Sequence, residues 1–357
     1  MARSGIGADK WHLPRHCELW LPAYVRGRWN SWFAKSNPKH VWLAIADHFE
    51  PLWHNASVSL ATERVSIWRR RLPLIASEHA DSTGRLPIYT FFYPDHHYRP
   101  ELLDVLAEMV SLGCADVEVH LHHDREGQQD FTDRIGTFTE TLFRRHGLLR
   151  KENGSLRFGF IHGNWALCNS VPGGQWCGLN NEITLLRDLG CYADFTMPSG
   201  ASTTQARTVN SIYWAAGDAS RPKSYDQGCV LQPRSASGDL LMIPGPLGLR
   251  WKERLWPRME TGEIAGYDMP TLYRANRWLD VAPRLGEHIF IKLFAHGAQE
   301  RNLIPLLGRG LTELFRWMST ACRDRGLVLH YVSTWQMYRA VMAIWHEIDP
   351  LSAAKSS

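Results

Sequence analysis

One short segment of this 357-residue chain places three histidines and an aspartate within five residues, at His120, His122, His123 and Asp124. The alternating apolar residues just before them are typical of a buried strand, in which side chains alternate between the two faces. His120 and His122 are therefore expected to point the same way. Two imidazoles that converge from one segment can bind a divalent metal. An isolated His-x-His pair also occurs in polar surface loops, so the surrounding elements must decide.

These elements follow one repeated pattern, in which an apolar run of strand length leads into polar residues and then into an amphipathic segment of helical spacing. Strands are expected near 41–46, 86–92, 116–119, 157–161, 191–196, 289–294 and 327–332, and helices near 58–80, 101–112, 128–146, 181–189, 310–325 and 334–346. Such alternation predicts an α/β protein with a mostly parallel sheet. About seven or eight units of this kind fit a (β/α) barrel better than an open sheet. Between 200 and 285 the pattern weakens, and only short strands near 211–216 and 239–243 are expected.

Polar residues lie where the expected strands end. The residues at these positions are Asp47, Asp95, His120, His122, His162 and His296. In α/β barrels the carboxyl ends of the strands carry the active site, so residues distant in sequence meet there. Eight of the 17 histidines fall in these loops, at positions 48, 96, 97, 120, 122, 123, 162 and 296. This clustering favours a metal-centred site over scattered surface histidines.

Composition excludes several other classes of protein. A net charge of +4 without a block of basic residues argues against a nucleic-acid partner. The seven cysteines are odd in number and include no Cys-x-x-Cys pair, which argues against a disulfide framework and a zinc ribbon. Neither a signal peptide nor a membrane-spanning run is recognisable, so a cytoplasmic protein is expected.

Three regions are expected along the chain. Residues 1–38 interleave aromatic and basic side chains and form a leader that packs on the main domain or, alternatively, makes peripheral contact with a membrane surface. Residues 39–347 form a single barrel domain, and residues 348–357 form a flexible tail.

The order of the segments resembles the polysaccharide deacetylases of the NodB-homology type (carbohydrate esterase family 4), especially their divergent bacterial relatives. Residues 47–50 (Asp-His-Phe-Glu) are similar to the first motif of that family and 118–122 (Glu-Val-His-Leu-His) to the second. Residues 158–165, 189–196 and 293–296 are similar to the third, fourth and fifth motifs. The resemblance implies an irregular seven-stranded barrel, a divalent metal, a carboxylate base, and a leucine and a histidine that meet the acyl group and protonate the leaving nitrogen.

The chain departs from the family pattern at three places. His48 stands where the first motif has a second aspartate, and Glu126 stands where the second motif has a further histidine. No arginine accompanies the third motif around His162. The resemblance therefore suggests the type of reaction, whereas the ligands must be assigned from their chemistry.

On these grounds Asp47, His120 and His122 are the expected metal ligands, with His48 as a substitute or fourth ligand. The metal is expected to be Zn²⁺, with Co²⁺, Ni²⁺, Mn²⁺ or Fe²⁺ as alternatives. Asp47 or Glu50 would take a proton from the attacking water.

His296 would be the general acid, a role that suits an ordinary pKa near 6.5. The expected substrate-binding residues are His162, Asn164, Trp165 and Leu293.

The expected function is removal of an N-acetyl or O-acetyl group from a glycan or lipid-linked sugar precursor in cell-surface polysaccharide biosynthesis. One alternative is a catalytically degenerate barrel that binds carbohydrate or acts as a scaffold. Another is a different metal-dependent amidohydrolase. The arrangement His120-x-His122-x-Asp124 is similar to the metallo-β-lactamase motif, but Arg125 follows where that motif has a histidine. No Gly-x-Ser-x-Gly segment indicates a serine nucleophile.

Overall fold

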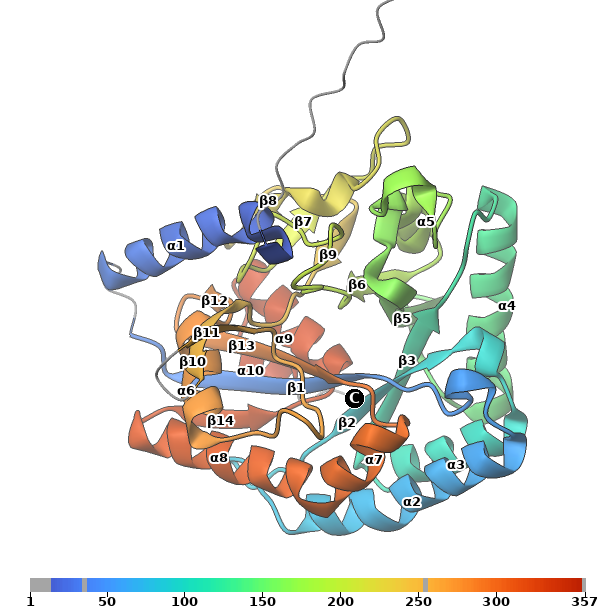
Figure 1. Cartoon of the computed structure of the whole chain (residues 1–357), viewed down its shortest axis with the longest axis horizontal. Coiled ribbons are helices and arrows are strands. Elements are labelled where there is room, and N and C mark those ends of the chain that lie inside the picture. The colour runs from blue at the N-terminus through green and yellow to red at the C-terminus, as the bar shows by residue number, and fades with distance from the viewer. Residues whose placement is uncertain (1–13, 34–36, 253–255, 355–357) are drawn as a thin grey trace, which may run out of the picture.

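A computed structural model describes residues 14–33, 37–252 and 256–354 of the chain. These residues form a mixed α/β fold with a twelve-stranded, mostly parallel sheet (Figure 1). The strands of its parallel part are β1 (His40–His48), β2 (Tyr89–Pro94), β3 (Ala115–Leu121), β5 (Ser155–His162), β6 (Cys191–Asp194), β9 (Leu240–Met242), β13 (His288–Ala295) and β14 (Val328–Tyr331). The expected α/β class and the mostly parallel sheet are confirmed.

Hydrogen-bonded neighbours in the sheet run in the order β12-β13-β1-β2-β3-β5-β6-β9-β7-β8, while β14 pairs with β1 and β4 pairs with β5. The remaining strands are short: β4 (Arg150–Glu152), β7 (Tyr213–Ala215), β8 (Cys229–Val230) and β12 (Arg284–Leu285). A separate hairpin joins β10 (Gly248–Lys252) to β11 (Trp256–Glu260). This hairpin was not expected from the sequence, because the region between 200 and 285 lacks a regular hydrophobic period.

Six helices lie where the sequence places them: α2 (Val58–Ser77), α3 (Pro100–Ser111), α4 (Gln128–His146), α5 (Glu182–Asp188), α8 (Leu311–Asp324) and α9 (Thr334–Trp345). Local signals begin and end them. The Ser57 hydroxyl accepts the Leu60 backbone N–H at the start of α2, and Gly147 ends α4 in the left-handed conformation. The structure adds α6 (Leu272–Val281) and α7 (Glu300–Pro305).

Short turns of helix occupy the connections. They are η1 (Pro14–His16), η2 (Trp53–Asn55), η3 (Asp95–His97), η4 (Gly163–Trp165), η5 (Leu167–Asn169), η6 (Pro172–Gly174), η7 (Ser224–Asp226) and the π-helical η8 (Leu306–Gly310). Three of them, η4 to η6, follow one another between β5 and α5, so this connection contains little regular structure.

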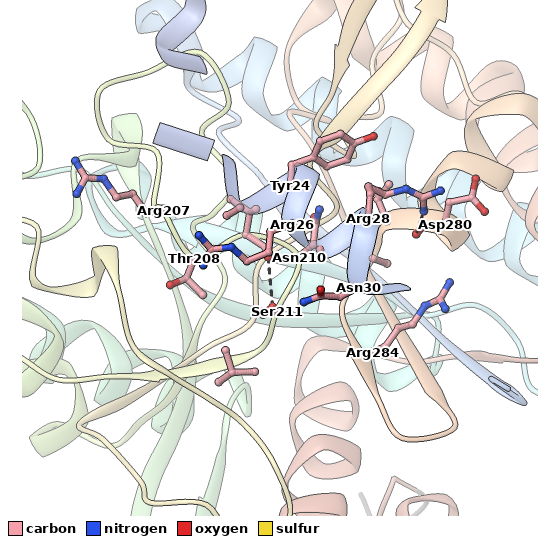
Figure 2. A pocket seen from close by; sticks show the side chains of 16 residues that line it. Tyr24, Arg26, Arg28, Asn30, Arg207, Thr208, Asn210, Ser211, Asp280 and Arg284 are labelled. Atoms are coloured by element: carbon pink, nitrogen blue, oxygen red, sulfur yellow. Dashed lines mark hydrogen bonds between the residues drawn. The ribbon is translucent and has the colours of Figure 1, made fainter. Parts of the chain in front are cut away.

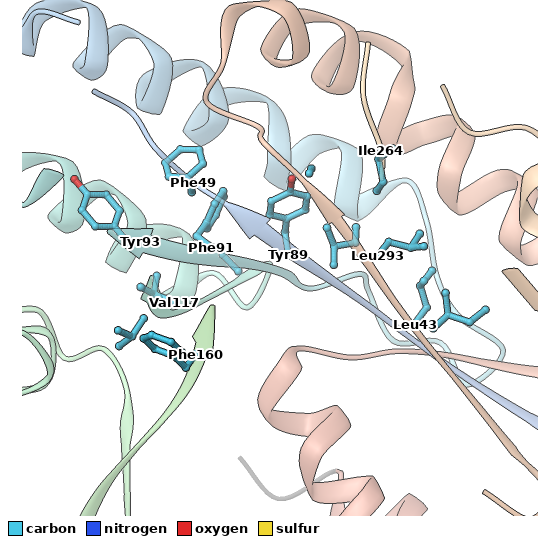
Figure 3. Packing of buried hydrophobic residues seen from close by; sticks show 14 of the residues in the cluster. Leu43, Phe49, Tyr89, Phe91, Tyr93, Val117, Phe160, Ile264 and Leu293 are labelled. Carbon is cyan, nitrogen blue, oxygen red and sulfur yellow. The ribbon is translucent and has the colours of Figure 1, made fainter. Parts of the chain in front are cut away.

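The sheet has two packed faces, and alternate residues of each strand belong to different ones. What we call the outer face contacts α2, α3, α4 and α8, and it carries the aromatic core of Figure 3, which includes Phe49, Phe91 and Phe160. The inner face packs against α9 and carries Trp42 and Ala44 of β1. The polar residues that follow the strand ends continue this alternation. Each of them therefore points to either the outer or the inner side of the sheet.

Strand pairing does not close the sheet into a barrel among the described residues, since no hydrogen-bonded ladder joins β9 to β13. A side chain of β13 instead contacts the segment that follows β6. Lys292 of β13 is buried on the inner face, and its Nζ donates to the carbonyl oxygens of Phe195, at 2.8 Å, and Met197, at 2.7 Å. The structure thus shows the parallel α/β sheet but not a closed seven-stranded barrel.

The expected leader and tail both contain helices. Helix α1 (Cys17–Phe33) buries Trp20 and Tyr24 against Leu247 and Val281, so two of the leader's aromatic residues are part of the core. Residues 1–13 and 34–36 lie outside the described residues. The expected flexible tail is corrected in part, because α10 (Pro350–Ala353) is helical and Ala354 is buried. Residues 355–357 lie outside the described part. No described helix combines the length and apolar character needed to cross a membrane.

Candidate metal centre

Glu50, His120 and His122 bring one carboxylate and two imidazoles together at the carboxyl ends of β1 and β3. Glu50 Oε1 lies 2.9 Å from His122 Nε2 and 3.9 Å from His120 Nε2. The two Nε2 atoms are 3.0 Å apart. Glu50 and His120 are buried, and His122 is partly exposed. A carboxylate and two histidines at these distances could hold a divalent metal ion.

The alternation of the strands explains why these three side chains meet. On β3, Val117 and Val119 enter the outer core, while His120 points to the inner face. His120 Nδ1 lies 2.9 Å from the carbonyl oxygen of Ile161 on the adjacent strand β5. Because a carbonyl oxygen only accepts hydrogen bonds, Nδ1 carries the proton, and Nε2, which lies near His122 Nε2 and Glu50 Oε1, keeps its lone pair. This is the tautomer that a metal-binding histidine requires.

Glycine and arginine residues hold His122 in place. A Cβ atom on Gly163 would lie 2.4 Å from the His122 ring, so only glycine allows the start of η4 to approach this ring so closely. Arg134 of α4 donates to the His122 carbonyl oxygen at 3.1 Å and to the carboxylate of Asp95 at 2.7 Å. Arg134 therefore holds the backbone of a candidate ligand and connects it to Asp95.

Four aromatic rings border the centre. The His48 ring centroid lies 5.2 Å from that of His120, 4.7 Å from that of His296 and 5.6 Å from that of Trp165. Phe294 is next to His296 and Trp165, with centroid distances of 6.2 and 6.5 Å. The centre is thus enclosed on this side by rings from β1, β13 and η4.

Burial and the neighbouring charges set the protonation states of the centre. Burial favours the protonated form of Glu50, but the adjacent imidazoles of His120 and His122 hold the pKa of Glu50 well below its usual range. Burial is the main reason why the pKa of His48 lies well below its usual value, and the electrostatic interaction with His296 lowers it further. Burial also lowers the pKa of His120 and that of His296. The centre therefore combines the ionised carboxylate of Glu50 with neutral imidazoles at His48, His120 and His296, which suits a divalent cation.

Asp47 does not belong to this group, contrary to its expected role as a ligand or base. Its Oδ1 accepts the Gly297 backbone N–H at 2.7 Å and its Oδ2 accepts the Tyr89 hydroxyl at 3.0 Å. Burial raises the pKa of Asp47 to about 7. The physical reason is alternation, because Asp47 follows Ile45 on the outer face, whereas His48 and Glu50 face inward. Asp47 instead connects β1 to the loop that follows His296.

Two expected substrate-binding residues also lie on the outer side. Leu293 is fully buried in the outer core (Figure 3). Its neighbour Phe294 contacts the rings of the centre instead. His162 is fully buried and faces His123 and Glu182 rather than the metal centre. A one-residue difference in strand position reverses the face to which a side chain points.

The other expected site residues lie at or near the centre. Trp165 packs on His48 and His296, and Asn164 beside it is exposed. His296 is next to the centre, but the ordinary pKa expected for a general acid is corrected, because burial lowers it. Its Nδ1 is buried and has no hydrogen-bond partner among the described residues.

A cavity of about 340 Å³ adjoins this aromatic wall. Trp165 and Phe294 line it, and so connect it to the rings that border the metal centre. Its polar lining includes Ser199, Arg258 and Glu263. A cavity with an aromatic face and several hydrogen-bonding side chains has the character of a small-molecule site.

A second cavity, of about 500 Å³, lies between α1 and the segments 207–211 and 280–284 (Figure 2). Its lining includes Arg26, Arg28, Arg207 and Arg284, with Asp280 as its acidic member. None of the candidate ligands lines it, so it is separate from the metal centre.

The structure also brings together four residues that sequence reasoning did not combine: His123, His162, Cys177 and Glu182. His123 directly follows His122. Strand alternation therefore predicts that its side chain lies on the opposite face of the sheet. Cys177 has no Cys-x-x-Cys partner in the sequence, and Glu182 falls at the start of an expected helix. Nothing in their spacing predicts that these two residues meet the histidines.

No protein-family model matches the chain, and a search of curated proteins finds no match either.

Proposed function

We propose that this protein is a metal-dependent hydrolase that removes an acetyl group from a glycan or a glycan precursor. The observation that carries the proposal is the convergence of Glu50, His120 and His122 at the carboxyl ends of two parallel strands. Two histidines and one carboxylate form the ligand set of known hydrolytic zinc sites, so Zn²⁺ is the proposed ion. The resemblance to the NodB-type deacetylases supports the reaction type, and we take the sheet as an opened form of that barrel.

A divalent ion in such a site supplies Lewis acidity, which polarises an acyl carbonyl and makes a water molecule more acidic. The chain itself must then move one proton. His48 is buried and His296 is partly buried, their pKa values are lowered, and they are therefore neutral imidazoles able to accept a proton.

His296 Nδ1 is the proposed acceptor, because it is buried and has no hydrogen-bond partner among the described residues. It takes the proton of the attacking water and delivers it to the leaving nitrogen when the C–N bond breaks. The products are acetate and an amine. A histidine thus replaces the carboxylate base that the sequence suggested, because Asp47 faces away and Glu50 is a ligand.

The aromatic wall and the adjoining cavity support a sugar as the substrate. Trp165 offers an indole face, and exposed Asn164 beside it offers an amide that can donate and accept hydrogen bonds. The cavity adds Ser199, Arg258 and Glu263 as further hydrogen-bonding groups. Flat apolar surface flanked by such groups matches the chemistry of a pyranose ring and its hydroxyls.

One observation favours a second candidate, a carbohydrate-binding protein without catalytic activity. Asp47 is bonded to Gly297 and Tyr89, which leaves Glu50 as the carboxylate in the metal-capable group. If histidine cannot replace the carboxylate base, the site would bind a metal and a sugar without turnover.

The deciding experiment measures metal content and acetate release from acetylated glycans and lipid-linked sugars. Wild type is compared with Glu50→Gln and with Glu63→Gln, whose side chain is exposed on α2. We expect acetate release that depends on bound metal, is lost in Glu50→Gln and persists in Glu63→Gln. Metal and glycan binding without acetate release would favour the binding protein. A folded wild type that takes up no metal at all would contradict both.

A further inference from the structure

The four residues that meet on the outer side of β3 and β5 come from separate segments. His123 follows β3, His162 ends β5, Cys177 lies in the irregular connection, and Glu182 begins α5. All four are buried, and one ligand atom from each lies within 4.8 Å of the others. Two imidazoles, a thiol and a carboxylate are the side chains that bind zinc in proteins.

We propose that His123, His162, Cys177 and Glu182 form a second metal site, which is structural and takes Zn²⁺ or another divalent ion with affinity for thiolate. This site uses none of the ligands of the proposed hydrolytic centre. The proposal can therefore be tested independently of the proposed function.

The distances within this group of four residues, which we call the tetrad, are those of a compact coordination shell. Glu182 Oε1 lies 3.0 Å from His123 Nε2 and 3.4 Å from His162 Nε2. Cys177 Sγ lies 3.3 Å from Glu182 Oε2. Ligand atoms at zinc bond lengths in a tetrahedron are themselves about 3.2–3.8 Å apart. The four side chains therefore need little movement to surround an ion.

The protonation of His162 provides an independent argument. Its Nδ1 lies 2.5 Å from the Gly163 carbonyl oxygen, so Nδ1 must be the atom that carries the proton. The Nε2 lone pair then faces the Glu182 carboxylate, and this buried Nε2 atom has no hydrogen-bond partner in the described structure. Two acceptors facing each other inside a protein are unfavourable unless a cation lies between them.

His123 has the neighbour that a zinc-bound histidine usually has. When its Nε2 is the ligand, Nδ1 carries a proton and faces Glu126 Oε2, 3.5 Å away. Both of these buried atoms lack a hydrogen-bond partner among the described residues. Glu126 is held in turn by Arg134. A carboxylate behind the ligand orients the ring and increases its basicity.

A closed site with four protein ligands has a structural role, because no position is left for a substrate. The connection between β5 and α5 contains only the short turns η4, η5 and η6, so few backbone hydrogen bonds hold it. A metal bound to Cys177 and Glu182 would fix this connection to the two strands. It would also fix Gly163, whose position against the His122 ring shapes the first centre.

Cobalt substitution separates the two sites, because only the second contains a thiol. We expect the Co²⁺-loaded wild type to show the near-ultraviolet thiolate-to-cobalt charge-transfer band. Cys177→Ser should lose this band, and Cys322→Ser, which changes a buried cysteine of α8, should keep it. Elemental analysis should give about one metal ion fewer per chain in Cys177→Ser than in wild type.

Glu50→Gln should lower the metal content while the charge-transfer band remains. Absence of the band from folded, cobalt-loaded wild type would overturn the proposal, even if Cys177→Ser does not fold. An unchanged band in Cys177→Ser would overturn it as well. Either result would identify the tetrad as a hydrogen-bonded network without a metal.

Discussion

His122 and His123 are adjacent in sequence and point to opposite faces of the sheet. His122 Nε2 lies 2.9 Å from Glu50 Oε1, and His123 Nε2 lies 3.0 Å from Glu182 Oε1. One backbone segment therefore supplies a ligand to each of two groups of buried polar side chains. Gly163 connects them further, since it packs on the His122 ring and follows His162. The two groups are therefore neighbours in the fold, although they share no residue.

Separate amide substitutions of Glu50 and Asp47 test which of the two carboxylates binds the metal. Glu50→Gln should weaken metal binding at the first centre by at least about 100-fold, because a charged ligand is lost. Asp47→Asn should retain the metal, since Asp47 contacts Gly297 and Tyr89 instead. Isothermal titration with Zn²⁺ or Co²⁺ measures both affinities. Equal loss in the two folded variants would restore Asp47 as a ligand.

Gly163→Ala should disturb the first centre without changing any candidate ligand. The added Cβ would lie 2.4 Å from the His122 ring, so the ring or strand β5 must move. We expect metal affinity at the first centre to fall about 10- to 100-fold. The matched control is Gly136→Ala in α4, where no atom lies within 4 Å of the new methyl group.

That control should instead stabilise the protein by about 0.5–1 kcal/mol, as alanine does in helices. Titration and thermal unfolding of both variants provide the comparison. Unchanged metal affinity in Gly163→Ala would show that His122 is not constrained by this contact.

Removing the imidazole of His296 should affect turnover more than metal binding. His296 lies beside His48 rather than within the metal-capable group, with ring centroids 4.7 Å apart. We expect His296→Ala to lower kcat about 10²- to 10⁴-fold, the usual contribution of a positioned proton-transfer group. Bound metal should stay at the wild-type level. If His296→Ala loses the metal, His296 is a ligand.

The histidines at the opposite end of β1 should make stability dependent on pH. His288 and His330 are partly or fully enclosed near Trp42, and burial lowers the pKa of each to about 4. A pKa depressed in the folded state gives stability that is present above about pH 6.5 and is lost as the pH falls toward 4. Denaturant unfolding between pH 7 and 4 should show this loss.

The double variant His288→Gln/His330→Gln should lose less stability over the same range, because its side chains do not acquire charge. The glutamine amide that replaces the His288 ring would still offer an oxygen to the Trp42 indole N–H, which His288 Nδ1 accepts at 3.1 Å. Parallel pH profiles of wild type and the double variant would contradict the assignment.

The secondary structure was largely predictable because hydrophobic period and capping residues are local properties. The strand expected at 116–119 is β3, and the helix expected at 128–146 is α4 with the same bounds. Between 200 and 285 the prediction failed for β10, β11 and α6, since short elements with mixed exposure carry no clear period. Closure into a barrel, a property of distant strand edges, was not found in the strand pairing of the described residues.

The sequence by itself determined that histidines gather at the ends of parallel strands, because polar residues after apolar runs mark those ends. The sequence positions also place His120 and His122 on one face of the sheet and His123 on the other, because side chains alternate along a strand. Only the tertiary structure decided that Glu50 rather than Asp47 meets these histidines, and that Cys177 and Glu182 join His123 and His162. These outcomes depend on where each strand leaves the sheet and how an irregular connection folds back. Such properties result from packing between distant segments and are not expressed in local spacing.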